Sequence, residues 1–152
     1  MENSLKQKAL SILGDNRIMS VATIRPDGWP QNTTVGFGNS GLTLYFVCDR
    51  GSQKAANLAH DNRVSVTIDH DVTDMHSIEG LSMAAHAFVD ESSMENAAAL
   101  MAQKYPGVID FPVPDPSQVH LVRLVPKVIS VIDYSKGFGH ADTVEIGPDD
   151  LS

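Results

Sequence analysis

The segment spanning residues 42–68 constrains the fold more than any other part of the chain. A run of apolar, β-branched and aromatic residues from Leu42 to Cys48 is typical of a strand, and a second β-rich run begins at Val64. Between them, Ser52 is a favourable helix N-cap, so a short helix is predicted to begin there. We therefore expect a strand, a short helix and a strand in direct succession.

Lys54 falls in the first turn of this predicted helix, where backbone N–H groups have no intrahelical partner and favour anions. A cation is disfavoured at that end of a helix unless something negative binds nearby, and a bound phosphate would explain the lysine. The alternative is that Ser52 only caps the helix and that Lys54 extends into water. These residues alone leave both interpretations open.

Length and charge limit the class of protein. The 152 residues are consistent with one domain over residues 1–152, and 11 Lys and Arg against 19 Asp and Glu give a formal net charge of −8. Because no basic cluster is present, neither nucleic acid nor an anionic membrane surface is an expected partner. The single cysteine, Cys48, excludes an internal disulfide, and the N-terminus lacks the apolar core of a signal peptide. We expect a soluble cytoplasmic protein.

Most of the remaining predicted elements are strands joined by short turns. A helix is expected over residues 3–14, strands over 18–24, 31–37 and 78–89, a helix with a core-packing Met and Ala stripe after 90–93, and a β-rich run over 119–132. Pro126 is expected at a bulge or an edge, and the chain is expected to end in an acidic tail. About six mainly antiparallel strands favour a small barrel with helices outside, because closure removes exposed strand edges.

Two patterns resemble functional motifs without their context. Residues 36–41 read G-x-G-x-x-G, but they lead into a strand, whereas a dinucleotide-binding fingerprint opens a helix. We interpret them as a hairpin turn. Residues 69–76 are rich in Asp and His, but their spacing fits no compact metal-ligand signature, so we interpret them as a polar connection and predict no metal site.

The order of elements, together with residues 50–66, resembles the pyridoxamine 5′-phosphate oxidase-like family of FMN-binding split β-barrels. The matching residues are Gly51-Ser52-Gln53-Lys54-Ala55, Leu58 and Asp61-Asn62-Arg63-Val64. The resemblance covers residues 5–135 in element order and is specific over 45–68. It implies a mainly β fold with flanking helices, in which six antiparallel strands form a split β-barrel.

The same resemblance implies a set of cofactor contacts. Lys54 would hold the FMN phosphate, with Ser52 and Gln53 beside it. Further flavin contacts would come from Asn32, Thr33, Thr34, Val35, Val47, Cys48, Tyr134, Phe138 and His140. Because the flavin of this family lies between two subunits, the resemblance also implies a homodimer. Each contact has a structural alternative: the threonines favour strands, Cys48 can pack as a small hydrophobe and Tyr134 as a core aromatic.

The departures from the family pattern limit the expected activity. The oxidase's Arg-Pro-x-x-Ser-Gln segment and late Arg-x-His are missing, and Gln53 replaces an arginine, so vitamin B6 oxidation is not expected. We expect an FMN-dependent oxidoreductase with a small-molecule electron donor or acceptor, in which no catalytic residue is assigned and His140 is the candidate proton donor. The alternatives are a non-catalytic flavin- or haem-carrying stress or sensor protein, and a deazaflavin-dependent reductase on the same fold.

Overall fold

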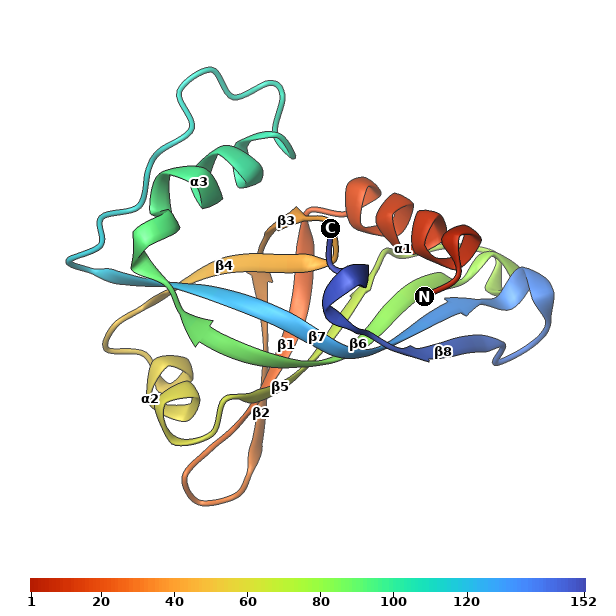
Figure 1. Cartoon of the computed structure of the whole chain (residues 1–152), viewed down its shortest axis with the longest axis horizontal. Coiled ribbons are helices and arrows are strands. Elements are labelled where there is room, and N and C mark those ends of the chain that lie inside the picture. The colour runs from red at the N-terminus through yellow and green to blue at the C-terminus, as the bar shows by residue number, and fades with distance from the viewer.

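The computed structural model describes all 152 residues as a curled antiparallel sheet with three flanking α-helices (Figure 1). The strands are β1 (Ile18–Ile24), β2 (Pro30–Gly36), β3 (Gly38–Ser40), β4 (Thr43–Asp49), β5 (Arg63–Asp69), β6 (Glu79–Val89), β7 (Val119–Asp133) and β8 (Ala141–Glu145). The helices are α1 (Asn3–Asp15), α2 (Gln53–His60) and α3 (Met94–Ala102), with 3-10 turns η1 (Met75–Ser77), η2 (Glu91–Ser93), η3 (Tyr134–Lys136) and η4 (Pro148–Asp150). The predicted split-barrel class is confirmed.

The strand order β2-β1-β5-β6-β7-β4-β3 positions α2 at one end of the sheet. The predicted strand, helix and strand are present as β4, α2 and β5, but the two strands do not pair with each other. β4 pairs with β7, β5 pairs with β1 and β6, and β6 and β7 lie between them. The helix therefore has to cross the open end of the curled sheet to connect them (Figure 1).

The strand count differs from the six that we expected, because β3 and β8 are additional. β3 replaces part of the predicted turn over residues 36–41, and its Gly38 lies so close to α3 that a Cβ atom there would come within 2.8 Å of the Met101 nitrogen. β8 replaces the predicted acidic tail and pairs with β7. Val144 and Ile146 pack against the core on this stretch, but two apolar residues in an acidic segment are too weak a pattern to predict a strand.

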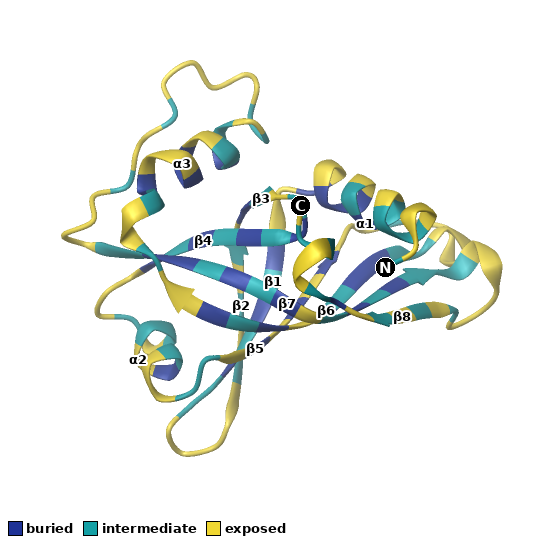
Figure 2. Ribbon diagram, in the orientation of Figure 1, coloured by how far each residue is buried: buried dark blue, intermediate teal, exposed yellow.

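The core lies on the concave side of the sheet (Figure 2), where alternate residues of β1, β4, β5 and β6 are buried. Three residues of α1, Ala9, Ile12 and Leu13, cover one part of it. A smaller separate cluster lies under α3 and contains Met94, Ala97, Met101 and Leu121. The Met and Ala stripe of α3 is therefore core packing, as predicted.

The predicted irregularity at Pro126 is confirmed. The β6–β7 register shifts between Ala84 and Ala85, opposite Val128 and Pro126, so the proline lies where a ladder hydrogen bond is not required. This bulge lets the long strand β7 bend and pair with both β4 and β8 along different parts of its length.

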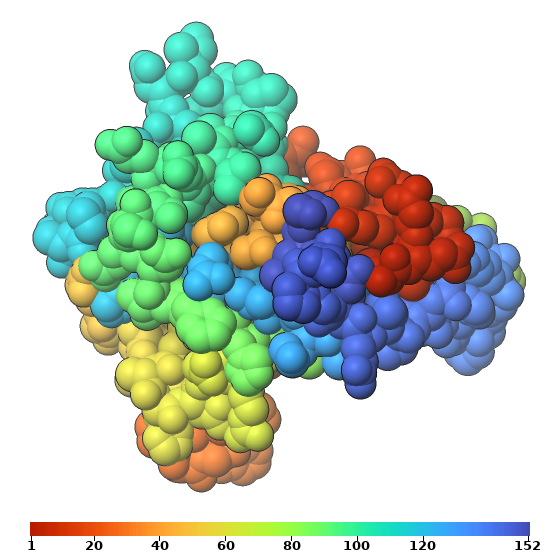
Figure 3. Space-filling view, in the orientation of Figure 1, coloured from red at the N-terminus to blue at the C-terminus, as the bar shows by residue number.

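The two ends of the chain meet on one face of the molecule (Figure 3). The Leu42 N–H donates to the Leu151 carbonyl at 2.9 Å, and the amino group of Met1 pairs with the Asp150 carboxylate at 2.6 Å. In the same view, α2 and the β1–β2 turn project at the side of the molecule away from the two termini. None of the helices is both long and apolar enough to cross a membrane.

Candidate functional site

A buried hydrogen-bond network centred on Asn57 holds α2 against the sheet. The Asn57 amide nitrogen donates to the Thr23 hydroxyl at 2.9 Å and to the Gln31 side-chain oxygen at 3.1 Å. The Asn57 oxygen accepts from the Gln53 side-chain nitrogen at 2.8 Å. Asn57 is 0% exposed, so these bonds replace water completely and fix the helix relative to β1 and β2. Gln53, predicted beside a phosphate, is engaged in this network.

Ser52 is the N-cap of α2, as predicted. Its hydroxyl accepts from the Ala55 N–H at 3.1 Å and lies 2.7 Å from the Asp49 carbonyl, to which it donates. These two bonds fix the direction in which the chain leaves β4 and enters the helix. The first turn of α2 contains no acidic residue, so the positive end of the helix dipole is not neutralised by the helix itself.

Lys54 lies in this first turn and has no carboxylate partner. None of the ion pairs of the chain includes it. Its side chain is half-buried and folds back toward β4, where Nζ lies 5.9 Å from the centroid of the Phe46 ring. Burial lowers the pKa of Lys54, because the desolvated ammonium has no anion beside it. The arrangement is an unpaired cation at a helix N-terminus, which is suited to an anionic ligand.

The other predicted contacts on β2 and β4 are divided between two faces. On β2, Thr33 and Val35 are half-buried, whereas Asn32 and Thr34 are exposed. On β4, Cys48 faces α2, and Val47 packs against the cluster under α3. Within one chain these side chains therefore do not form a single surface.

The Thr33 hydroxyl is the one buried side-chain oxygen or nitrogen of the chain that has no hydrogen-bond partner. Thr33 follows Gln31 on the same face of β2, and Gln31 already bonds to Asn57 of α2. The hydroxyl is therefore free to form a hydrogen bond with a ligand.

The segment between β7 and β8, which contains Tyr134, Phe138 and His140, lies at the opposite end of the long axis from α2 (Figure 1). The Tyr134 and Phe138 rings pack edge to face with centroids 5.6 Å apart, and Phe138 is 87% exposed. His140 Nε2 lies 3.1 Å from an oxygen of Asp142. The structure thus does not bring these three residues to Lys54 within one chain.

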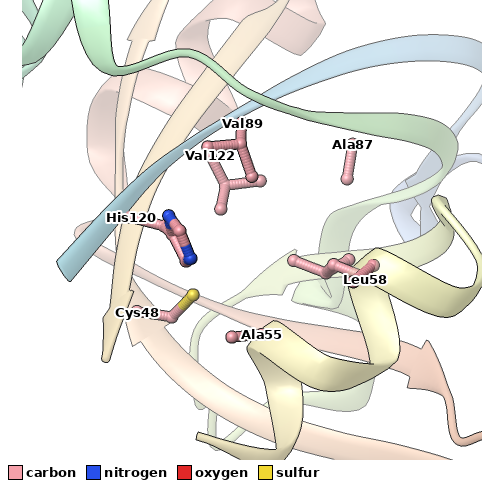
Figure 4. A pocket seen from close by; sticks show the side chains of 8 residues that line it. Cys48, Ala55, Leu58, Ala87, Val89, His120 and Val122 are labelled. Atoms are coloured by element: carbon pink, nitrogen blue, oxygen red, sulfur yellow. The ribbon is translucent and has the colours of Figure 1, made fainter. Parts of the chain in front are cut away.

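A largely apolar cavity of about 320 Å³ opens beside α2 (Figure 4). Its walls come from β4, α2, β6 and β7, and the lining residues are Cys48, Ala55, Leu58, Ala59, Ala87, Val89, His120 and Val122. Cys48 and His120 are the two lining residues that are not Ala, Val or Leu. An apolar pocket with a few polar groups is the usual form of a small-molecule site.

His120 is a residue of this cavity that the sequence did not indicate. Its Nδ1 lies 2.9 Å from Glu91 Oε1, and the same carboxylate pairs with Arg50. Arg50 is held in turn by the Pro116 carbonyl, 2.8 Å from its Nε. The His120 hydrogen bond is the main reason why the pKa of Glu91 is lowered. No sequence signal links Cys48 to His120, because their proximity depends on the pairing of β4 with β7.

Comparison with known proteins identifies the family. The family model for pyridoxamine 5′-phosphate oxidase matches residues 5–133, which is most of the chain. The chain belongs to the pyridoxamine 5′-phosphate oxidase-like family. General stress protein 26 of Bacillus subtilis is 25% identical over 99 residues, which are 65% of this chain and 66% of that protein.

Solved structures of other proteins share the fold. General stress protein 26 from Bacillus anthracis superposes with a TM-score of 0.69 at 19% identity, over 93% of this chain and 98% of that one. A heme binding protein from Mycobacterium smegmatis gives a TM-score of 0.74 at 21% identity, over 95% of this chain and 59% of that one. At these identities the likeness shows the fold, and the ligand has to be argued from the residues of this chain.

Proposed function

We propose that this protein binds FMN and acts as a flavin-dependent oxidoreductase on a small-molecule donor or acceptor in the cytoplasm. The observation that carries the proposal is Lys54, a half-buried ammonium without a counter-ion at the N-terminus of α2. A phosphate beside it would pair with the charge and accept from the backbone N–H groups of the first helical turn. The Ser52 cap and the Asn57 network support the proposal, because they hold that turn rigidly.

The donor set of the chain fits a flavin mononucleotide. Lys54 would hold the phosphate, the unpartnered Thr33 hydroxyl would bond a polar atom of the cofactor, and apolar side chains near α2 would exclude water. When bound, a flavin supplies the redox chemistry, and the protein contributes binding and orientation. We assign no side chain a role in proton transfer to or from the flavin.

We further propose a homodimer. α2, which contains Lys54, and the β7–β8 segment, which contains Tyr134 and Phe138, lie at opposite ends of one chain, so a single copy cannot enclose a ligand between them (Figure 1). A second copy in an antiparallel orientation would bring its own aromatic pair to α2 of the first. Phe138, which is 87% exposed in one chain, would be covered in such an assembly.

The test compares FMN with riboflavin, which differs only in lacking the phosphate. We expect the wild type to retain FMN through desalting and to bind it more tightly than riboflavin, with dissociation constants from flavin fluorescence. Loss of the charge-assisted contact in Lys54→Ala should cost about 1.5–3 kcal/mol, or about 10- to 100-fold in FMN affinity, and should leave riboflavin affinity nearly unchanged. Lys127→Ala is the matched control, because Lys127 is an exposed lysine on β7.

Either of two results would refute the proposal. One is a wild-type protein that binds neither flavin, and the other is a Lys54→Ala variant with the wild-type preference for FMN over riboflavin. A Soret band in the purified protein would favour a haem carrier instead, which is the ligand named for the Mycobacterium smegmatis protein. We favour the flavin, because an unpaired lysine suits a phosphate.

A further inference from the structure

The Glu91–His120 hydrogen bond sets the tautomer of the imidazole in the apolar cavity. An ionised carboxylate can only accept hydrogen bonds, so the 2.9 Å contact requires that His120 Nδ1 carries a hydrogen and donates it to Glu91. Neutral His120 then has an unprotonated Nε2 that can accept a proton. The ion pair with Arg50 keeps the Glu91 carboxylate ionised and in place. In its neutral form His120 therefore presents a free Nε2, which is the tautomer of a general base.

Cys48 is directly opposite this base. Cys48 and His120 are register partners in the antiparallel β4–β7 ladder, so their side chains leave the sheet on the same face. Figure 4 shows the Cys48 sulfur and the His120 ring pointing toward one another at the wall of the cavity. Cys48 is 7% exposed, and the cavity gives its sulfur access to a small molecule.

The surroundings of Cys48 have opposing effects on its thiolate. Burial raises the pKa of the Cys48 thiol, whereas the nearby Lys54 ammonium and the Ser52 hydroxyl act to lower it. A thiol in this setting is mostly protonated at neutral pH, so it gains more from an adjacent base than an exposed thiol would. His120, the register partner of Cys48 across the ladder, is the base that lines the same cavity.

We propose that Cys48, His120 and Glu91 form a thiol–disulfide exchange site for a small disulfide with uncharged, apolar substituents. The Cys48 proton moves to His120 Nε2, and the sulfur attacks one sulfur of the disulfide. The old S–S bond breaks as the new one forms, and the leaving sulfur takes the proton from His120. Cys48 is thereby oxidised to a mixed disulfide, and half of the small disulfide is released as one thiol.

The cavity determines the substrate class. Six of its eight lining residues are Ala, Val or Leu, so a charged substituent would be desolvated there without a partner. Glu91 is a positioning residue, because it touches the imidazole and not the reacting atoms. The exchange does not require a bound flavin and goes beyond the function proposed above, although it uses the cavity whose apolar side chains that function also places near the flavin.

The test uses 4,4′-dithiodipyridine, a small uncharged disulfide whose released thiopyridone is measured by absorbance. Because Cys48 is the only cysteine, all of the signal comes from one site, and Cys48→Ser provides the blank. We expect one equivalent of thiopyridone per native chain. At neutral pH the second-order rate constant should fall at least about tenfold in His120→Gln, by a smaller factor in Glu91→Gln, and not at all in His86→Gln. His86 is a matched control, since it is a half-buried histidine of β6 whose Nδ1 faces Asn62.

The pH profile separates a base from a merely structural residue. In His120→Gln the rate should rise with pH only as the Cys48 thiol itself ionises, whereas the wild type should keep a faster rate below that pH. Circular dichroism and the thermal midpoint identify any variant that has not folded. If His120→Gln does not fold, Glu91→Gln still tests the proposal, because the Glu91 side chain lies at the surface.

Equal rates in the wild type, His120→Gln and Glu91→Gln would overturn the proposal, as would a native Cys48 that reacts only after urea is added. The flavin content is read from the visible spectrum before each measurement. Because the comparison among variants needs no flavin, failure to bind FMN would refute the proposed function alone.

Discussion

Replacing Asn57 with alanine should weaken the attachment of α2 to the sheet, and it should not lower the helix propensity of α2. The substitution removes three hydrogen bonds, to Thr23, Gln31 and Gln53, and leaves the buried Thr23 hydroxyl without that partner. At about 1 kcal/mol for each bond the loss is about 3 kcal/mol, and the better helix propensity of alanine returns at most about 0.7 kcal/mol. We therefore expect the free energy of unfolding to fall by about 2–3 kcal/mol.

The measurement is urea unfolding followed by far-ultraviolet circular dichroism at a fixed protein concentration. Asn96→Ala is the control, because Asn96 is an exposed asparagine in α3 that gains the same propensity. It should change stability by less than about 0.5 kcal/mol. Thr23→Val combined with Asn57→Ala should be less destabilising than the sum of the two single changes, since both remove one shared bond.

Two results would refute this reasoning. If Asn57→Ala costs no more than Asn96→Ala, the network does not hold the helix. If the double variant is strictly additive, the Thr23 bond carries no energy. A fall in stability with additive behaviour would instead locate the effect in the remaining contacts to Gln31 and Gln53.

Two further predictions concern residues that pack around α3 and α1. Burial lowers the pKa of Lys104 to about 8, although its ammonium donates to the Leu13 and Asn16 carbonyls. The unfolded chain keeps this proton up to a higher pH than the folded chain does. As the pH rises from 8 to the ordinary lysine pKa, the free energy of unfolding of the wild type should therefore increase relative to that of Lys104→Met. A constant difference between the two proteins in urea titrations across that range would contradict this. Gly38→Ala should cost about 1–3 kcal/mol because its Cβ would meet the α3 backbone, whereas Gly14→Ala, with nothing within 4 Å, should stabilise by about 0.5–1 kcal/mol; equal thermal shifts would be the contrary result.

The features that the sequence predicted are those that depend on neighbouring residues. The Ser52 cap follows from one residue type at the start of a helix, and the Pro126 bulge follows from the missing N–H of proline. The split-barrel class followed from the order of elements and the resemblance. These signals are local, so a single sequence contains them.

The features that it did not predict depend on pairing between distant segments. His120 reaches Cys48 only through the β4–β7 ladder, and Asn57 reaches Gln31 only because α2 lies against β2. Hydrophobic periodicity says which face of a strand is buried and not which strand lies beside it. The division of Val47 and Cys48 between two faces of β4 follows from alternation, but the elements that cover each face do not.

The separation of β4 from β5 in the sheet also determines when the site can form during synthesis. As the chain emerges from a ribosome, β4, α2 and β5 appear together, but β4 has no long partner until β7 has been made. The walls of the cavity beside α2 include Val122 of β7, which is synthesised long after α2. The long loop between these segments must therefore close before the cavity is complete. A nascent chain that stops before β7 can hold Lys54 and Cys48 and still present no cavity to a ligand.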